Sequence, residues 1–414
     1  MERILIVKLS SIGDVVHALP VLRTIRHNLP NSYIAWIVED KAREILEGNK
    51  DIDKIITINT KQWRKVLNRK TIKELLDVIN ILRKERFDTA IDLQGLIKSG
   101  VISYLSRAKT RIGFDSENCR EFLNILFTNK KVSPKKEAIH IVDKNLSLLK
   151  LFDFKEIKRE FFISTSLKDD KYINDFLLKN SINGKPIIAV NLGAGWKTKE
   201  WGIKNYTELC DRIISEVGAN IILTWGPGEE DMVNEVADSM SCMLFAAPTT
   251  TLKQLVVLLR RCKLFIGGDT GPLHIAATLK IPTVAIYGPT DPLRNGPYGD
   301  NHFIIHKKIK CSGCYKRACD TIECMKLISV DEVFSAVKSS IVNCQFKGGG
   351  IMPIDKELLD ILACPKCKGD IYLTQDGNGL ICKACKLMYE IKDDIPIMLI
   401  DEAVKLNENL NPVK

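Results

Sequence analysis

The feature that most constrains this chain is a repeated alternation of short apolar runs with longer amphipathic stretches. In the first part, apolar runs predict buried strands at residues 3–9, 33–39, 54–59 and 88–93. Apolar residues at helical spacing between these runs predict helices at 15–29, 41–49 and 71–87, and a second series continues the alternation from residue 187 to residue 288. Strands that alternate with helices predict parallel sheets with helices on both faces. The expected fold class is therefore α/β, with two such halves.

Length and composition predict three domains. The 414 residues exceed what one hydrophobic core usually holds. The polar stretch near 164–186 and the linker "QFKGGGIMP" at 345–353 interrupt the alternation. In the last part, a "DGNG" turn between two strand-like runs predicts a small ribbon. The predicted domains are 1–165, 166–345 and 354–414.

The charge of the chain is unevenly distributed. The net charge is +10, but residues 354–414 carry −3, so the rest of the chain carries +13. A basic body predicts an anionic partner, namely phosphates, an acidic glycolipid, a membrane surface or nucleic acid, although solubility alone also explains it. Nucleic acid is the least favoured, because the basic residues are not interleaved with aromatic ones.

Hydropathy favours a cytoplasmic protein. No apolar run approaches the roughly 18 residues needed to span a bilayer. The stretch "MERILIV" is too short for a signal peptide and leads directly into a polar loop.

The segment "KLSSIGDVVHALP", residues 8–20, places the carboxylate of Asp14 after the first predicted strand. This residue can cap the helix that follows. It can also take a proton from an incoming hydroxyl, because ligands favour the carboxyl ends of parallel strands. Ser10 and Ser11 can donate hydrogen bonds to substrate oxygens, and His17 is expected to be structural.

Three glycine loops of the second half follow predicted strands. In "FIGGDTGPLHIAATLK", residues 265–280, glycine allows close backbone approach, and the helix N-terminus offers N–H groups to a diphosphate. Its spacing is neither the dinucleotide fingerprint nor a Walker loop. Asp269 and Thr270 can hold a sugar hydroxyl, and His274 can reach phosphate. A tight turn with a helix cap is the alternative.

The other two loops add charged residues to this pattern. "NLGAGWKTKEW" offers Lys197 and Lys199 to phosphate, and "TWGPGEED" offers Glu229 to ribose hydroxyls. A solvated basic loop is the alternative for the first of them. Together the three loops predict a nucleotide-diphosphate pocket.

Residues for an acceptor are expected in the first half. Gln94 and Lys98 follow a predicted strand in "DLQGLIKSG", so they are expected to face the same cleft as Asp14. Arg111 and Arg120 lie nearby in sequence and can meet an acidic acceptor. Exposed, solubilising charge explains the two arginines equally well.

Eight of the thirteen cysteines form two clusters. In one cluster, two Cys-x2-Cys pairs separated by 14 residues predict a structural, four-thiolate zinc site at Cys364, Cys367, Cys382 and Cys385. The other cluster can bind zinc or an iron–sulfur cluster, or form labile disulfides, and a structural metal is favoured; it comprises Cys311, Cys314, Cys319 and Cys324.

Four sequence motifs, which occur in the same order as in a known family, give residues 1–343 a resemblance to that family. They are "ILIVKLSSIGDVVHALPVLRTIR", "DLQGLIKS", "NLGAGWKTKEW" and "FIGGDTGPLHIAATLKIPTVAIYGPTDP". These resemble the lipopolysaccharide heptosyltransferases of glycosyltransferase family 9. The resemblance implies the GT-B architecture, in which two Rossmann-like domains face a cleft. It also implies an inverting transfer, without a catalytic metal, of L-glycero-D-manno-heptose from ADP-heptose to the inner core.

The resemblance further implies a lipid A–core acceptor and a peripheral location on the cytoplasmic face of the inner membrane. Acceptor binding is assigned to Gln94, Lys98 and Arg120. By position in the motifs, Asp14 matches the catalytic base, and the donor-binding residues are Ser10, Lys199, Glu229, Asp269, Thr270, Gly271 and His274.

Residues 354–414 resemble the small zinc ribbons related to the activator subunit of RNA and protein methyltransferases. This implies a protein partner for the ribbon. Two alternatives to heptose transfer stay open. One is a GT-B transferase for another nucleotide sugar or acceptor. The other is an inactive adaptor that docks a partner through the ribbon.

Overall fold

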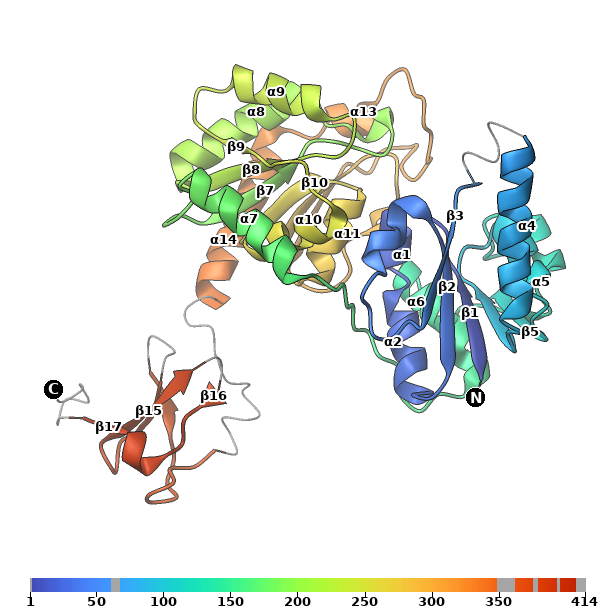
Figure 1. Ribbon diagram of the computed structural model, residues 1–414. Helices are drawn as coiled ribbons and strands as arrows, with labels where there is room; N and C mark the ends of the chain where they lie inside the picture. Colours follow the sequence, from blue (N-terminus) through green and yellow to red (C-terminus); the bar gives the residue numbers. More distant parts are fainter. Residues whose placement is uncertain (1, 61–67, 348–361, 375–378, 393–394, 407–414) are drawn as a thin grey trace. The chain divides into compact units, whose positions relative to one another are not determined.

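The computed structural model describes residues 2–60, 68–347, 362–374, 379–392 and 395–406 (Figure 1). The chain divides into two compact units, Met1–Ser340 and Ile341–Lys414. The first unit contains both predicted α/β halves, each built on a six-stranded parallel sheet.

The first sheet has the strand order β3-β2-β1-β4-β5-β6. Its central strand β1 is apolar throughout after Arg3 and is buried on both faces, as strands inside parallel sheets are. The chain runs outward from β1 to β3 and then returns to β4, so the order reverses between β1 and β4. Ligand sites of open parallel sheets lie at such a reversal, beyond the carboxyl ends of the strands. The strands are β1 (Arg3–Val7), β2 (Tyr33–Glu39), β3 (Lys54–Ile58), β4 (Thr89–Asp92), β5 (Thr110–Phe114) and β6 (Lys130–Val132).

Helices cover both faces of this sheet, with α1, α2 and α6 on one face and α4 and α5 on the other (Figure 1). The helix expected at 15–29 is instead two helices, because Pro20 lies in the first turn of α2 and cannot continue the hydrogen bonding of α1. The short helix expected at 41–49 is a 3-10 turn, η1. The helical elements are α1 (Ile12–Val16), α2 (Leu19–Asn28), η1 (Asp40–Ile45), α4 (Arg69–Lys84), α5 (Ile97–Leu105), η2 (Phe122–Leu126), α6 (Ile141–Ser147) and η3 (Leu148–Phe152).

The second sheet repeats the same topology, with the order β12-β11-β10-β7-β8-β9. Its order reverses between β7 and β10, and two of the predicted glycine loops follow these strands. The strands are β7 (Ile187–Asn191), β8 (Asn220–Thr224), β9 (Phe245–Ala246), β10 (Leu264–Gly268), β11 (Thr283–Tyr287) and β12 (His302–His306).

The helices of this half connect the strands and cover the sheet (Figure 1). The stretch 164–186, predicted as a boundary, contains α7, which contacts α10. The helical elements are α7 (Leu167–Lys179), η4 (Lys197–Lys199), α8 (Ile203–Arg212), η5 (Ile213–Val217), α9 (Glu230–Ser239), α10 (Leu252–Arg260), α11 (Gly271–Thr278), α12 (Pro292–Asn295), α13 (Glu323–Lys326) and α14 (Val330–Lys347).

The two halves pack directly against each other through α1 and α11. One continuous hydrophobic cluster contains Val15 and Val16 of the first half together with Leu273 and Ile275 of the second. At this contact the backbone of α1 closely approaches the His274 side chain. A Cβ atom at Gly13 would lie 2.4 Å from Cδ2 of His274. A Cβ atom at Gly271 would likewise lie 2.9 Å from the Ile12 side chain. The start of α1 and the start of α11 are therefore held together.

The second unit contains a small antiparallel sheet. Its buried core includes two of the predicted metal ligands, Cys364 and Cys382, together with Leu380 and Tyr389. The predicted turn at 376–379 and the predicted domain start at 354 lie mostly or wholly outside the described residues. The elements are β13 (Tyr372–Leu373), β14 (Gly379–Cys382), β15 (Leu387–Lys392), β16 (Ile395–Pro396), η6 (Ile400–Glu402) and β17 (Val404–Lys405).

The close packing of α1 on α11 predicts that Gly13 tolerates no side chain. Gly13→Ala should lower the free energy of unfolding by about 1–3 kcal/mol, because the added methyl group overpacks the contact with His274. Thermal unfolding of the variant and the wild type measures this. Gly195→Ala is the control, because no atom lies within 4 Å of a Cβ placed there. Equal melting temperatures for Gly13→Ala and the wild type would contradict the packing argument.

Candidate active site

Asp14 lies in the first turn of α1, where it acts as part of a capping box. The backbone N–H of Ser11 donates to Oδ2 of Asp14 at 2.9 Å, and the Ser11 hydroxyl donates to the same oxygen at 3.2 Å. The N-cap residue is Ser11, not Asp14 as the cap interpretation had it; Asp14 contributes to the cap from the third helical position and uses only one carboxylate oxygen for it. The other, Oδ1, faces the ammonium group of Lys8 at 3.9 Å. Asp14 can therefore cap its helix and still face a cavity.

The carboxylate of Asp14 is surrounded by positive charge. Lys8 is buried at the end of β1, and its Nζ donates to the carbonyl oxygen of Leu93 at 2.8 Å. Nη1 of Arg120 lies 3.7 Å from Oδ2 of Asp14. Burial alone would raise the pKa of Asp14, but Lys8, Arg120 and the Ser11 N–H hold it below its usual value. Burial lowers the pKa of Lys8 to about 8, against the attraction of Asp14. Asp14 is consequently an ionised carboxylate near neutral pH.

The second cluster of charges follows β10. Nζ of Lys199 donates to Oδ2 of Asp269 at 2.6 Å, and Nε2 of His274 lies 3.1 Å from Oδ1 of the same carboxylate. Burial favours the neutral acid, but His274 and Lys199 hold the pKa of Asp269 far below its usual value. Asp269 therefore fixes the side chains of Lys199 and His274 beside the N-terminus of α11, where unpaired N–H groups favour an anion.

Glu229 joins the loops that follow β7 and β8. Its Oε2 accepts a hydrogen bond from the N–H of Gly226 at 2.8 Å. A Cβ atom at Gly193 would collide with the Glu229 carboxylate, so a side chain there would displace that carboxylate. Thr270 bonds Asn191 at the end of β7, with Oγ1 and Oδ1 3.2 Å apart. The three predicted glycine loops thus meet at one edge of the second sheet.

Three histidines come together where α1 meets α11. The ring of His17 lies 4.3 Å from that of His274 and 5.4 Å from that of His140. The ring of His140 is fixed, because Nδ1 accepts from the N–H of Val142 and Nε2 lies 3.0 Å from the carbonyl of Gly296. Burial and the neighbouring histidines hold the pKa of His17 well below its usual value, and burial lowers that of His140. His17 is structural, as predicted, but it belongs to a cluster that joins the halves.

The predicted acceptor residues are only partly brought together. Gln94 is buried and accepts hydrogen bonds from the N–H groups of Leu9 and Ser10 at 3.0 and 3.3 Å, so it supports the loop before Asp14. Arg120 reaches Asp14, as described above.

Two other basic residues of the predicted acceptor region lie elsewhere. Lys98 pairs with Glu39 at 3.0 Å and with the hydroxyl of Thr60 at 3.3 Å. It is not among the residues that line the Asp14 cavity. Arg111 donates to the carbonyl oxygens of Ala108 and Phe127 instead of facing a ligand. The structure thus gives Lys98 and Arg111 no contact with Asp14.

Three cationic residues beside Asp14 were missed by the sequence interpretation: Lys8, Lys144 and Arg294. Lys8 gave one signal, a lysine directly after an apolar strand. Lys144 and Arg294 lie more than 120 residues from Asp14 in sequence, and no motif marks them.

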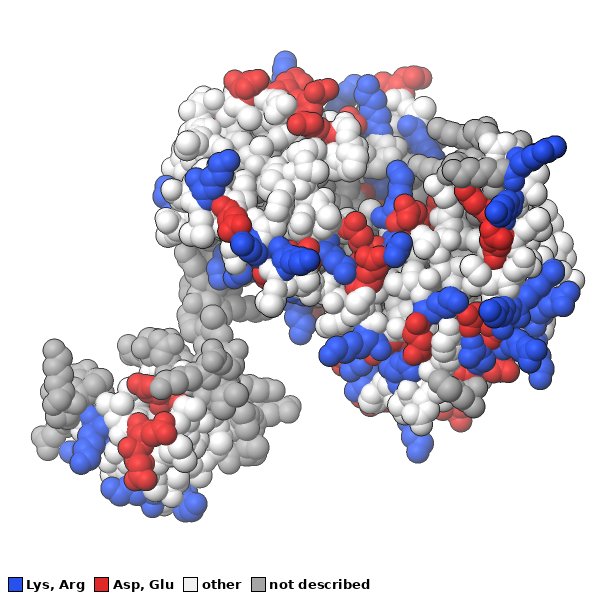
Figure 2. All heavy atoms as spheres, viewed as in Figure 1, with Lys and Arg blue, Asp and Glu red and all other residues white. Residues whose placement is uncertain are grey.

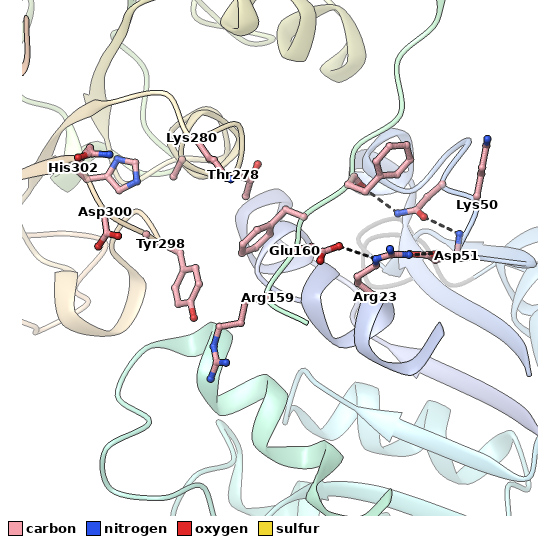
Figure 3. Close-up of a pocket in the computed structure, with 16 residues that line it drawn as sticks. Arg23, Lys50, Asp51, Arg159, Glu160, Thr278, Lys280, Tyr298, Asp300 and His302 are labelled. Atoms are coloured by element: carbon pink, nitrogen blue, oxygen red, sulfur yellow. Dashed lines mark hydrogen bonds and ion pairs between the residues drawn. The ribbon is translucent and has the colours of Figure 1, made fainter. Parts of the chain in front are cut away.

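A larger cavity of about 830 Å³ lies elsewhere, at the C-terminal end of α11, where Thr278 and Lys280 line it (Figure 3). Its charged residues largely neutralise one another, since Arg23 pairs with both Glu160 and Asp51 at 3.0 and 3.4 Å. None of the predicted catalytic or binding residues lines it. We therefore place the candidate active site at the carboxyl ends of the strands, where charge and hydrogen-bond donors converge.

The ribbon cysteines have the geometry of a metal site. The sulfur atoms of Cys364, Cys367, Cys382 and Cys385 all lie within 4.8 Å of one another. The Cys367–Cys382 and Cys364–Cys385 sulfur distances are 3.6 and 4.0 Å. Tetrahedral zinc with Zn–S bonds of about 2.3 Å requires about 3.8 Å between sulfurs, so the site fits zinc. Four thiolates would fill its coordination, and the ion would stabilise the small fold.

The second cysteine cluster lacks this geometry. Among the described residues, the four ribbon cysteines are the only group of metal-ligating side chains with mutually close donor atoms. In the second cluster Cys311 and Cys319 are exposed, whereas Cys324 is buried. Burial and the nearby thiols raise the pKa of Cys324. The structure does not support the favoured interpretation of this cluster as a metal site.

Solved structures of similar fold match the first unit. A family 9 glycosyltransferase from Veillonella parvula has a TM-score of 0.69 at 21% identity, with 83% of this chain and 97% of that chain covered. The Escherichia coli heptosyltransferase WaaC, solved with ADP, has a TM-score of 0.65 at 26% identity, covering 82% of this chain and 99% of that chain. The two facing Rossmann-like halves define the GT-B class of glycosyltransferases.

Comparison with known sequences identifies the family to which the chain belongs. The description "Glycosyltransferase family 9 (heptosyltransferase)" matches residues 75–324. Lipopolysaccharide heptosyltransferase 1 of E. coli K12 is 30% identical over 305 residues, which are 73% of this chain and 92% of that protein. The chain belongs to glycosyltransferase family 9. Residues 355–394 match a separate description, "Trm112p-like protein", so the predicted resemblance of the ribbon is confirmed.

The buried histidine cluster predicts that stability falls in acid. The pKa of His17 is depressed in the folded protein, so below about pH 6.5 the unfolded chain binds a proton that the folded protein does not. The free energy of unfolding should then fall by at most about 1.4 kcal/mol per pH unit for this residue. Denaturant unfolding between pH 7.5 and pH 5 measures the slope, and His17→Gln should reduce it. The same slope in both proteins would show that His17 titrates equally in the folded and unfolded states.

The cysteine geometry predicts that the ribbon binds zinc in equal molar amount. Elemental analysis of purified protein measures the content, and Cys382→Ser should abolish it, because three remaining thiolates leave the site incomplete. Cys319→Ser, in the second cluster, is the control and should retain the zinc. Proteolysis within residues 341–414 should accelerate when a chelator removes the metal. A metal-free wild type that resists proteolysis equally would contradict a structural role.

Proposed function

We propose that this chain is an inverting glycosyltransferase that moves L-glycero-D-manno-heptose from ADP-heptose to the inner core of lipopolysaccharide. The observation that carries the proposal is the contact between α1 and α11. In this contact the start of α1, which carries Asp14, packs against the start of α11, which follows the glycine loop proposed to bind a diphosphate. Membership of family 9 and the likeness to a heptosyltransferase solved with ADP support the choice of donor.

In the proposed reaction, Asp14 takes the proton of the acceptor hydroxyl. The hydroxyl oxygen then forms a bond to the anomeric carbon from the face opposite the diphosphate, and the bond from that carbon to the diphosphate oxygen breaks. ADP leaves with the electron pair, so the anomeric configuration inverts. Asp14 is already ionised, and therefore can accept the proton without first losing one.

The leaving group is stabilised by residues of the second half. Lys199 is aimed by Asp269, and the N-terminus of α11 contributes N–H groups. Glu229 lies on two glycine loops, where its carboxylate suits ribose hydroxyls. These contacts grow in importance as negative charge develops on the diphosphate, so they lower the barrier rather than only binding the donor.

The acceptor is proposed to be a lipid A–core molecule at the cytoplasmic face of the inner membrane. The segments from α5 to β6 carry the exposed basic residues Arg107, Lys109, Lys130 and Lys131. Figure 2 shows Lys and Arg gathered on the side of the first half that bears α5 and β5. Such a surface attracts anionic headgroups. Within the described residues, no helix has the length and apolar character that crossing a membrane demands.

Two alternatives are separated by direct assay. A panel of nucleotide sugars, read by release of ADP or UDP, distinguishes heptose transfer from transfer of another sugar. An inactive adaptor would release neither nucleotide with any donor and acceptor. The intact pairing of Lys199 with Asp269 favours an active enzyme over that adaptor.

The base assignment predicts that Asp14→Asn abolishes transfer. The loss in kcat should be at least about 10²–10⁴-fold, because the amide cannot accept the proton. Asparagine can still accept the Ser11 hydrogen bond, so the fold and the affinity for ADP should be retained. Mass spectrometry of defined lipid A–core acceptors measures transfer, and calorimetry measures ADP binding. Asp77→Asn, at an exposed position of α4, is the control for removing an acid. Turnover by Asp14→Asn near the wild-type rate would refute the assignment.

A further inference from the structure

The imidazole ring of His274, on α11 of the second half, is held by residues of the first half. Figure 1 shows α1 and α11 side by side. The ring of His17, the C-cap residue of α1, lies 4.3 Å from that of His274, edge-on, with an angle of 64° between the planes. Gly13, four residues before His17, leaves room for the ring, because a Cβ atom there would lie 2.4 Å from Cδ2 of His274. The first half therefore fixes the position of this ring.

One nitrogen of the His274 ring faces the donor loops. Nε2 lies 3.1 Å from Oδ1 of Asp269, and Nζ of Lys199 donates to Oδ2 of the same carboxylate at 2.6 Å. The Lys199 ammonium group also donates to the backbone carbonyl of Asp269 at 3.1 Å. Each oxygen of the buried carboxylate thus has a partner. A displacement of the ring would turn the carboxylate and, with it, the ammonium group.

The contact between His17 and His274 is one of packing. Nε2 of His17 and Nδ1 of His274 are buried and have no hydrogen-bond partner within the described residues. Edge-to-face pairs of aromatic rings are favourable without such a bond. Burial holds the pKa of His17 well below its usual value, so the ring is neutral near pH 7 and adds no charge beside the donor loops. Another aromatic ring of similar size should therefore serve in its place.

His140 provides a comparison within the same cluster. Its ring also packs against that of His17, with 5.4 Å between the centres. Its nitrogens, however, lie 3.1 Å from the N–H of Val142 and 3.0 Å from the carbonyl of Gly296. These contacts hold His140 to α6 and to the end of α12 rather than to the donor loops.

The position of His17 connects two parts of the proposed site. Asp14, the proposed base, lies three residues before His17. Lys199 is proposed to meet the donor diphosphate, and its ammonium group also lies 4.5 Å from the centre of the Trp196 ring. A lysine that is already held in place loses less freedom when a diphosphate binds, so holding it raises the affinity. Contacts that begin on the helix of the base therefore reach the lysine of the leaving group.

We propose that His17 is a positioning residue of the donor site. Its ring holds that of His274, which orients Asp269, and the carboxylate of Asp269 aims Lys199 at the donor diphosphate. The base and the donor lysine are then brought into place by the same contact between α1 and α11. This inference rests on the proposed glycosyl transfer.

Calorimetry of ADP binding and steady-state transfer by His17→Ala test this role. The affinity for ADP should fall about threefold to tenfold, the cost of ordering one side chain, and the KM for the donor should rise to match. The KM for the acceptor should stay within about twofold of the wild type. His17→Phe should restore most of the affinity, because its ring retains the packing. Unchanged ADP affinity in His17→Ala, or no recovery in His17→Phe, would overturn the proposal.

His140→Ala is the matched control, because it removes a ring of the same cluster whose hydrogen bonds lead elsewhere. Its ADP affinity should stay within about twofold of the wild type. Thermal unfolding of both variants shows whether they lose comparable stability. An equal loss of ADP affinity in His140→Ala would attribute the effect to general destabilisation and overturn the proposal. If His17→Ala does not fold, His17→Leu replaces it with the same loss expected, because leucine fills the space without an aromatic edge.

Combining His17→Ala with Lys199→Ala shows whether the effect passes through Lys199. The double variant should bind ADP within about twofold of Lys199→Ala alone, because the lysine that His17 positions is already absent. A merely structural histidine would give additive losses instead. A further loss of about threefold or more in the double variant would therefore overturn the proposal.

Failure of the proposed function has a separate signature. Inorganic pyrophosphate carries the diphosphate alone, so its binding to these variants needs neither ADP-heptose nor a lipid acceptor. A wild type that binds pyrophosphate with the same dependence on His17 and Lys199, but transfers no heptose, would refute the proposed donor and acceptor, not the positioning role. A wild type that transfers heptose, while His17→Ala binds both ADP and pyrophosphate normally, would refute the positioning role alone.

Discussion

The structure of the first unit depends on the close approach of α1 and α11. Gly13 lies against the ring of His274, and Gly271 lies against the side chain of Ile12, so each helix start has a glycine where the other presses on it. Helix starts expose N–H groups and carry partial positive charge. Because α1 has only five residues, the positive charge around Asp14 comes mainly from the side chains of Lys8 and Arg120. The loop of Asp14 and the loop before α11 approach each other because these two helix starts do.

This concentration of positive charge has a chemical consequence for Asp14. Its lowered pKa makes it a weaker base than a carboxylate in an apolar pocket would be. In the proposed reaction, proton transfer to Asp14 would therefore gain its driving force late, when the attacking hydroxyl has begun to bond to the anomeric carbon and has become more acidic. The surrounding cations suit such a transition state, because negative charge moves from the nucleophile to the diphosphate on the other side of the sugar. The low pKa of Asp14 comes from Lys8 and Arg120, whereas the proposed stabilisation of the leaving group comes from separate groups, Lys199 and the N-terminus of α11.

Sequence reasoning predicted the sheets and the meeting of the glycine loops well, because both follow from local patterns. The alternation of apolar runs with amphipathic segments predicted two parallel sheets, and the sheet topology confirms them. The loop that carries Lys199 (the lysine loop) and the "GGDTG" loop were assigned to one pocket, and the hydrogen-bonded pair of Lys199 and Asp269 joins the two loops. Side chains that meet across the interface could not be predicted in this way. Arg294 on α12 and Lys144 on α6 line the same cavity as Asp14, and neither their spacing nor their neighbours in sequence indicate that they converge. The break between α1 and α2 could have been predicted from a local signal, because Pro20 lies inside the predicted helix 15–29.

The segment that carries the second cysteine cluster, Cys311 to Cys324, has contacts that explain a structural role its cysteines did not suggest. The hydroxyl of Thr198 donates to the carbonyl of Lys316 at 2.8 Å, so this segment is bonded to the lysine loop of the donor site. The guanidinium of Arg317 lies 4.9 Å from the centre of the Trp196 ring, and Nζ of Lys199 lies 4.5 Å from the same centre. Lys199 is thus positioned by an aromatic ring as well as by the carboxylate of Asp269. A lysine ammonium on a flexible chain loses much freedom when it must meet a diphosphate, and this double support reduces that cost before the donor arrives. The segment therefore supports the loop of Lys199, the proposed donor-binding lysine, through its backbone and its arginine, whatever the oxidation state of its thiols.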